Sequence, residues 1–189
     1  MGLSNEQLLI AEVKTRSPFG WEAPGTWQRR FDLAKQYGGW VSVHTDERWG
    51  GSFDLLAHAR GETDLPLLAK GLHGSDELVR QAFDRGADYA LVVGRVPTAD
   101  DIELERCLIE PVAIGQFEEF AARGVQRMVH NARDVFSGQP QHFSFEEARA
   151  LWDGWLCQAS LIQTVEDVRP DAQAVLVGTH LPEFIQSMP

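Results

Sequence analysis

The sequence predicts an α/β protein whose parallel strands close into a (β/α)8 barrel, the TIM-barrel architecture. Eight short apolar runs alternate with amphipathic stretches along the 189 residues. Apolar runs without polar alternation are typical of strands buried on both faces, as in a parallel sheet. Eight successive strand–helix units favour a closed barrel over an open sheet. Because such barrels usually take about 250 residues, we expect a compact version.

The predicted strands are Leu8–Val13, Trp40–His44, Leu65–Ala69, Tyr89–Val93, Cys107–Ile109, Gln126–His130, Trp155–Gln158 and Ala174–Val177. Helices are predicted where a capping residue or a terminal glycine flanks an amphipathic stretch. These stretches are Thr26–Tyr37, the residues after Ser52, those between Ser75 and Gly86, Gln116–Arg123, and those after the Ser144–Glu147 capping box.

Three further segments have weaker helical patterns. Thr164 and Asp167 resemble a second capping box, and the segments after Gly94 and Gly178 allow at most short helices. No linker or break in composition divides the chain, so we expect residues 1–189 to form a single domain.

Composition and charge exclude several classes of function. The chain carries 17 Lys and Arg against 28 Asp and Glu, a formal net charge of −11. This balance argues against a nucleic-acid or anionic-membrane surface, although a local cationic pocket for phosphate is compatible with it. We expect neither a membrane span nor a signal peptide, because no run of about 18 apolar residues and no basic leader is present. Cys107 and Cys157 stand alone in apolar runs, which predicts buried thiols and a cytoplasmic protein.

Polar side chains recur where the predicted strands end. In parallel α/β folds these ends form the active site, and no glycine-rich nucleotide motif follows a strand here. Unpaired buried charges cost several kcal/mol, so charges that converge are normally paired or functional. A partly desolvated lysine among other cations can also exchange protons near neutral pH. The strand ends carry Glu12, Lys14, His44, Thr45, Lys70, Glu110, His130, Asn131, Arg133, Ser160, Gly178 and Thr179.

These strand ends lie in motifs that together resemble the indole-3-glycerol phosphate synthase family, a carboxy-lyase of tryptophan biosynthesis. The second-strand segment SVHTDERWGGSFDLL is similar to a family segment that usually reads SVLT, FGGS and DL. The resemblance covers nearly the whole chain in the right order. The other motifs are IAEVKTRSP (Ile10–Pro18), LPLLAKG (Leu65–Gly71), LIEP (Leu108–Pro111), HNARD (His130–Asp134), TVEDV (Thr164–Val168) and AVLVG (Ala174–Gly178).

The resemblance implies a (β/α)8 lyase that acts on a carboxyphenylamino-deoxyribulose phosphate without a metal or organic cofactor. It implies that Lys70 is the general acid and that Glu110 is its carboxylate partner. Glu12 and Lys14 would serve the later dehydration, and Asn131 would bind a sugar hydroxyl. The residues expected to hold the substrate and its phosphate are Ser17, Arg133, Ser160, Gly178 and Thr179. The metal-free expectation agrees with the absence of His or Cys spacing suited to a metal site.

Departures from the family pattern leave the substrate open. The seventh strand ends in Ala159-Ser160-Leu161 instead of Glu-Ser-Gly, so an acidic residue is replaced and the leucine is expected to clash with a phosphate. One alternative is therefore a diverged member of a specialised pathway, with another arylamine–sugar or other small ligand. Another is a catalytically silent barrel that binds a ligand.

The cover of the active site is a second open question. The family's extra N-terminal helix is absent ahead of Glu12, so the mouth is expected to be open. Loops that carry Trp21 and Trp49, or a partner subunit in an oligomer, would then have to close it. For these two tryptophans, core packing and contact with an aromatic ligand remain equal alternatives. His44 and His130 are likewise open between the core and the ligand.

Overall fold

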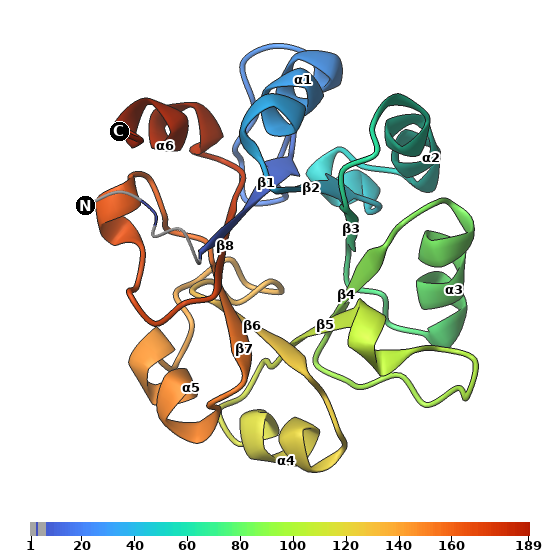
Figure 1. Ribbon diagram of the computed structural model, residues 1–189, viewed down its shortest axis with the longest axis vertical. Helices are drawn as coiled ribbons and strands as arrows, with labels where there is room; N and C mark the ends of the chain where they lie inside the picture. The colour runs from blue at the N-terminus through green and yellow to red at the C-terminus, as the bar shows by residue number, and fades with distance from the viewer. Residues whose placement is uncertain (1–2, 4–6) are drawn as a thin grey trace.

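The computed structural model describes Leu3 and residues 7–189. Eight parallel strands form one closed barrel in chain order, with helices around the outside (Figure 1). This architecture confirms the predicted (β/α)8 barrel. No helix of the described part of the chain is long and apolar enough to cross a membrane.

The strands lie close to their predicted positions, with ends that shift by one or two residues. They are β1 Leu8–Val13, β2 Trp40–His44, β3 Leu67–Lys70, β4 Tyr89–Val93, β5 Cys107–Glu110, β6 Arg127–Asn131, β7 Trp155–Ala159 and β8 Ala174–Val177. The helices are α1 Trp27–Tyr37, α2 Phe53–Glu62, α3 Asp76–Asp84, α4 Gln116–Ala122, α5 Phe145–Leu151 and α6 Leu181–Ser187. The predicted caps Ser52, Ser75 and Ser144 each accept a hydrogen bond from a backbone N–H of the first turn, and so does Thr26, which was expected inside α1 and instead caps it.

Alternation along the strands separates two apolar layers. Buried aromatic side chains between strands and helices include Phe31, Phe117, Phe120 and Phe184. The barrel interior has its own cluster, which includes Ile10, Leu68, Leu108 and Val129. Two residues further along the same strands, the same face carries Glu12, Lys70, Glu110 and Asn131. The polar site is therefore the last interior layer of the barrel, since side chains two apart share a face.

The barrel is compact because the helices after β4 and β7 are each reduced to one 3₁₀ turn. Residues 94–106 contain only the 3₁₀ turn Leu104–Arg106, and the segment after β7 contains only Val165–Asp167. The Thr164–Asp167 capping box forms as predicted, but it begins this single 3₁₀ turn and no longer helix. Shortening between β4 and β5 and of the last helix was expected, whereas the loss after β7 was not.

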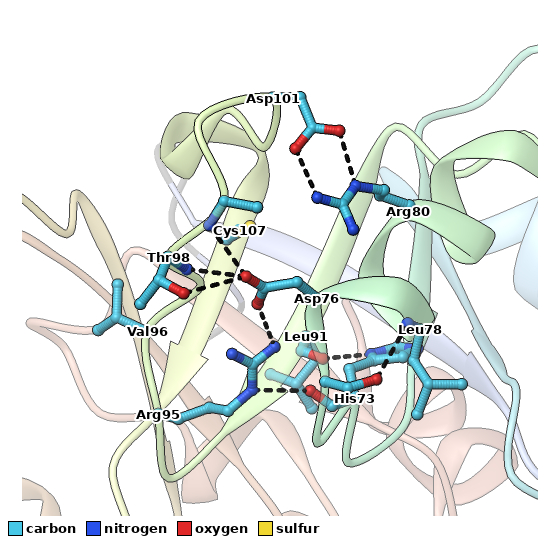
Figure 2. A network of polar contacts seen from close by, with 12 residues as sticks. His73, Asp76, Leu78, Arg80, Leu91, Arg95, Val96, Thr98, Asp101 and Cys107 are labelled. Atoms are coloured by element: carbon cyan, nitrogen blue, oxygen red, sulfur yellow. Dashed lines mark hydrogen bonds and ion pairs between the residues drawn. The ribbon is translucent and has the colours of Figure 1, made fainter.

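A polar network holds the long β4–β5 connection against the start of α3 (Figure 2). Asp76 forms an ion pair with Arg95 at 2.7 Å and accepts hydrogen bonds from the backbone N–H groups of Thr98 and Ala99. Burial opposes ionisation of Asp76, but Arg95 and these N–H groups lower its pKa to about 2. Arg95 also donates to the backbone oxygen of His73. The network thus replaces the missing helix as the anchor of this segment.

The two cysteines are buried free thiols, as the sequence predicts. Burial raises the pKa of Cys107 to about 11, so it has little thiolate at neutral pH. Cys157 lies in the interior cluster, and burial raises its pKa further. Neither thiol is suited to act as a nucleophile.

Candidate active site

A cavity of about 290 Å³ opens at the carboxyl ends of the strands. The expected site residues that line it are Lys14, Ser17, Lys70, Glu110, Asn131, Arg133, Ser160 and Thr179. The other two expected residues, Glu12 and Gly178, lie behind this lining. The closed barrel thus brings together residues that are up to 165 positions apart in the chain, as in the hydrogen bond from Lys14 to Thr179.

Glu12 is the centre of a buried charge network. Its Oε1 atom accepts hydrogen bonds from Lys70 Nζ at 2.5 Å and from His44 Nε2 at 2.8 Å. Burial alone raises the pKa of Glu12, but Lys70, His44 and Lys14 together lower it well below its ordinary value. Glu12 is therefore a carboxylate at neutral pH, paired with the Lys70 ammonium.

Glu110 has the opposite electrostatic character. Burial raises its pKa to about 7, and the opposing effects of Lys70 and of the Asn131 hydrogen bond only partly offset this. Asn131 Nδ2 donates to Glu110 Oε1 at 3.0 Å, while Oε2 is buried without a hydrogen-bond partner among the described residues. Glu110 is thus the carboxyl group that changes protonation near neutral pH and has a free oxygen.

These two carboxylates correct one expectation. Lys70 pairs with Glu12 and not with Glu110, so Glu110 is not its hydrogen-bonded partner in this structure. The reason lies in side-chain reach across the barrel. Glu12 extends from β1 past β2 to the end of β3, whereas Glu110 is held by Asn131 of the adjacent strand β6.

One side of the cavity carries two cations and a hydroxyl group, from Lys14, Arg133 and Thr179. Lys14 Nζ donates to Thr179 Oγ1 at 3.4 Å. Burial lowers the pKa of Lys14, and Lys70, Arg133 and Arg30 lower it further against the opposing effect of Glu12. Arg133 Nη1 donates to Gly138 O within its own loop, which holds the guanidinium beside the cavity. This side has the charge to receive an anionic group.

Arg30 is a buried cation that the sequence did not single out. It comes from α1, and its Nη1 donates to the backbone oxygen of Gly178 at 3.1 Å. Its guanidinium lies 5.2 Å from the centre of the Trp21 ring, and Lys14 Nζ lies 5.4 Å from the same centre. Trp21 therefore lines the cavity in contact with two cations, which favours the cavity-wall alternative for this residue.

Gly178 has a packing role. A Cβ atom at Gly178 would overlap the Oε2 atom of Glu12. Gly178 does not line the cavity, so its expected direct contact with a substrate phosphate has no support in this geometry. Its lack of a side chain makes room for the Glu12 carboxylate.

Ser160 and Leu161 form an unusual turn after β7. Both have left-handed backbone conformations, with φ of 66° and 55°. Ser160 lines the main cavity, but Leu161 instead lines a neighbouring hollow between β6, β7 and the start of α5, and its side chain is 53% exposed. The expected clash of Leu161 with a bound phosphate is therefore wrong for the side chain, which points away from the cavity.

At the ends of β3 and β4, across the barrel from β8, the cavity lining is apolar and consists of Leu72, Leu91 and Val93. Aromatic residues from two loops complete the wall. The Trp49 ring stacks on His44 with an angle of 2° between planes, and Phe19 packs against Gly138. Phe19 belongs to the loop after β1 and Gly138 to the loop after β6, so these two loops meet at the mouth.

His44 is the main site residue that the sequence left undecided. It lines the cavity, is 3% exposed and binds Glu12 directly. Its one sequence signal is its place at a strand end, where the resembling family usually has leucine. His130 instead faces α5 and donates a hydrogen bond from Nε2 to the Phe143 backbone oxygen, outside the main cavity.

Comparisons with known proteins agree with this picture at the level of distant similarity. No protein-family model matches the chain. The indole-3-glycerol phosphate synthase of Bacillus cereus (strain G9842) is 28% identical over 201 aligned positions, which cover 92% of this chain and 76% of that protein. The same enzyme of Prochlorococcus marinus (strain MIT 9215) is 34% identical over 102 positions, which cover 50% of this chain and only 33% of that protein.

A solved structure with the same architecture is that of a 3-hexulose-6-phosphate synthase. It matches with a TM-score of 0.65 and 14% identity, over 97% of this chain and all of that one. At this identity the match concerns the fold alone. Together, the comparisons establish a TIM barrel with distant similarity to indole-3-glycerol phosphate synthases.

Proposed function

We propose that the protein is a carbon–carbon lyase of the indole-3-glycerol phosphate synthase type. Its substrate would be a carboxyphenylamino-deoxyribulose phosphate, and its reaction an acid-catalysed ring closure with loss of carbon dioxide and water. The observation that carries the proposal is the polar layer at the cavity floor, where a Glu12–Lys70 ion pair lies beside a protonatable Glu110. The sequence similarity supports the same reaction class.

The two protonation states suit the two stages of this chemistry. In the first, the aryl carbon that bears the carboxylate bonds to the sugar carbonyl carbon, and the carbonyl oxygen takes a proton from the Lys70 ammonium. The carboxylate then leaves as carbon dioxide, and its bonding electrons restore the aromatic ring. In the second, the new hydroxyl leaves as water with a proton from an acid, while the neighbouring ring CH2 carbon loses a proton to a base and the C=C double bond of the indole forms.

Glu110 is well placed for the second stage. A group with a pKa near the working pH can both give and take a proton, and Glu110 belongs to the cavity lining and has a buried Oε2 atom without a hydrogen-bond partner among the described residues. Asn131 fixes its other oxygen. Glu12, which is held by two donors, serves better as the permanent counter-charge of Lys70 than as a second proton carrier.

The cavity walls match the two ends of such a substrate. The phosphate would lie against Lys14, Arg133, Ser160 and Thr179, which carry the cationic and hydroxyl groups. The aryl ring would lie against the apolar side formed by Leu72, Leu91 and Val93. Aromatic and aliphatic walls with a few polar groups are typical of small-molecule sites.

A second candidate is the same chemistry on another arylamine–sugar or a related ligand. It is favoured by Ala159, which lies in the interior cluster where the family has an acidic residue, and by Phe19 and Trp21 at the mouth. This candidate keeps Lys70 and Glu110 in the same roles. It differs only in the groups that the walls accept.

Incubation with carboxyphenylamino-deoxyribulose phosphate, followed by indole absorbance, tests the proposal. The chain offers a matched control, because its three lysines are Lys14, Lys35 and Lys70. Lys35 lies on α1 in ion pairs with Asp32 and Glu62, away from the cavity. Lys70→Met is expected to abolish turnover, and Lys35→Met to leave it unchanged.

The outcomes separate the two candidates. Indole formation that requires Lys70 supports the first. No turnover by a folded wild-type sample at high enzyme concentration contradicts it. Turnover of a different arylamine–sugar that again requires Lys70 would support the second.

A further inference from the structure

We propose that His44 is a positioning residue that holds the Glu12 carboxylate on Lys70, and that Trp49 holds His44 in place. This inference rests on the proposed function only for its catalytic consequence. The hold itself is a property of the folded chain that can be measured without a substrate.

The strand order gives His44 its importance. Glu12 lies on β1, His44 on β2 and Lys70 on β3, and His44 and Lys70 are register partners. The Glu12 side chain therefore crosses in front of β2 to reach Lys70. The side chain at position 44 lies under the Glu12 side chain where it crosses β2. Histidine at this position supplies a hydrogen-bond donor to the Glu12 carboxylate. A leucine in its place would leave Glu12 Oε1 with the Lys70 donor alone.

The protonation of His44 limits its role to positioning. Burial lowers the pKa of His44, and the nearby Lys70 and Lys14 charges lower it further, against the opposing effect of Glu12. A neutral imidazole can donate to Glu12 from Nε2, and its Nδ1 atom is buried without a partner among the described residues. Such a donor could pass its proton to Glu12 only while Nδ1 takes up another, and no described residue supplies a proton to Nδ1, which argues against a proton relay through this bond.

The loop after β2 is built to fix the imidazole. Trp49 stacks on it with ring centres 5.7 Å apart, and the Arg48 guanidinium lies over the Trp49 ring, 4.9 Å from its centre. Asp46 holds Arg48 and caps the 3₁₀ turn Glu47–Trp49. A Cβ atom at Gly51 would overlap the backbone oxygen of His44, so this glycine lets the loop close tightly on the strand end.

Opposite His44, the backbone of Gly178 confines the other side of the same carboxylate. Because a Cβ at Gly178 would overlap Glu12 Oε2, the carboxylate lies between β8 and His44. A carboxylate with one oxygen bound twice and the other confined has few alternative rotamers. His44 is thus one of two supports that keep the Lys70 counter-charge in one place.

Trace labelling of lysines with acetic anhydride tests directly whether His44 keeps the Glu12 carboxylate on Lys70. Labelling at Lys70, measured by peptide mass spectrometry, is compared with labelling at Lys35 as the internal reference. His44→Leu is expected to increase relative labelling of Lys70 at least about tenfold, because hydrogen bonds to charged groups are among the stronger ones. His44→Gln, whose amide can donate from nearly the Nε2 position, is expected to restore the wild-type ratio.

The same variants have a kinetic prediction. If the protein has the proposed lyase activity, His44→Leu lowers kcat by about tenfold or more with a small change in KM, since His44 acts through Glu12 and Lys70. Circular dichroism and thermal unfolding establish that each variant is folded. Should His44→Leu fail to fold, Trp49→Leu replaces it, and this variant is also expected to increase Lys70 labelling.

The outcomes are distinguishable from those of the proposed function. Unchanged Lys70 labelling in folded His44→Leu, or no restoration by His44→Gln, overturns the positioning role whether or not the protein is a lyase. A wild-type protein without lyase activity contradicts the proposed function alone, and the labelling ratio still decides the role of His44.

Discussion

Gly178 of the β8–α6 connection and Glu12 of β1 are in such close contact that no side chain fits between them. A Cβ atom on Gly178 would overlap Glu12 Oε2, and the backbone oxygen of Gly178 is bound by Arg30. The glycine therefore cannot move aside freely. One backbone position thus controls where the buried carboxylate, and with it the Lys70 ammonium, can lie.

Gly178→Ala is expected to destabilise the protein by about 1–3 kcal/mol, as overpacked interiors do, and to displace Glu12 from Lys70. Urea denaturation measures the first effect and a crystal structure the second. Gly61→Ala is the control, because a Cβ at this α2 position has open space, and the change is expected to stabilise by about 0.5–1 kcal/mol. Equal stability of wild type and Gly178→Ala would contradict the tight contact.

Glu110 predicts a fall in stability as the pH rises from about 4.5 to about 7. Because burial raises its pKa to about 7, the folded chain keeps this proton where the unfolded chain has released it. The free energy of unfolding therefore decreases across this range by roughly 3 kcal/mol from this group. Glu110→Gln should remove this decrease, so its gain over wild type appears at pH 8 and vanishes near pH 4.

Denaturant titrations of both proteins at several pH values measure the effect. A Glu110→Gln variant whose stability difference from wild type does not vary between pH 4 and 8 would show that the native carboxyl ionises normally. In an active enzyme, the same carboxyl also predicts a change in kcat/KM with an apparent pKa near 7, which Glu110→Gln should abolish.

The left-handed backbone at Leu161 predicts that glycine at this position gives a more stable protein than alanine. The φ of 55° at Leu161 is unfavourable for a residue with a Cβ atom, at a cost of about 1–2 kcal/mol. Leu161→Gly should therefore be more stable than Leu161→Ala by about 1 kcal/mol, since both lack the leucine side chain and only alanine keeps the Cβ. Thermal unfolding of the pair measures this difference.

Leu161→Gly also tests the position of the leucine side chain outside the main cavity. Affinity for inorganic phosphate, measured by calorimetry, should be similar in wild type and the glycine variant, because Leu161 does not line that cavity. A large gain in phosphate affinity would place the side chain in the anion's path.

Asp76 predicts acid-sensitive anchoring of the β4–β5 connection. Its pKa of about 2 is below the value of an unfolded aspartate, so its stabilisation is present above pH about 4 and is lost as the pH falls to about 2. Asp76→Asn should lower the free energy of unfolding by about 2 kcal/mol at pH 7. At pH 2 the variant and the wild type should differ little.

The exposed pair of Asp101 with Arg80 offers the matched control, as both pairs join α3 to the same connection (Figure 2). Asp101→Asn is expected to change stability very little at any pH, because solvent screens the charges of such pairs. An equal effect of the two substitutions at pH 7 would mean that the partly buried Asp76 network contributes no more than a surface pair.

Much of the fold was determined locally, and so the sequence alone predicted it. The apolar runs from Leu8–Val13 to Ala174–Val177 and the caps Ser52, Ser75 and Ser144 act over a few neighbouring residues. Their patterns survive folding because each strand is buried on both faces and each cap bonds its own helix. The sequence also predicted the convergence of Lys14, Lys70, Glu110 and Asn131, since parallel strands place their carboxyl ends at the same end of a barrel.

Only the tertiary structure decided which of the polar side chains at this end of the barrel pair with one another. Lys70 binds Glu12 and not Glu110, Gly178 makes room for a carboxylate, and Leu161 turns out of the cavity. The spacing of residues along the sequence does not contain these contacts. They are set by side-chain reach across a closed barrel and by the left-handed turn after β7. Burial then gives chemically identical groups opposite properties: Glu12 is a carboxylate beside Lys70, and Glu110 holds its proton up to about pH 7.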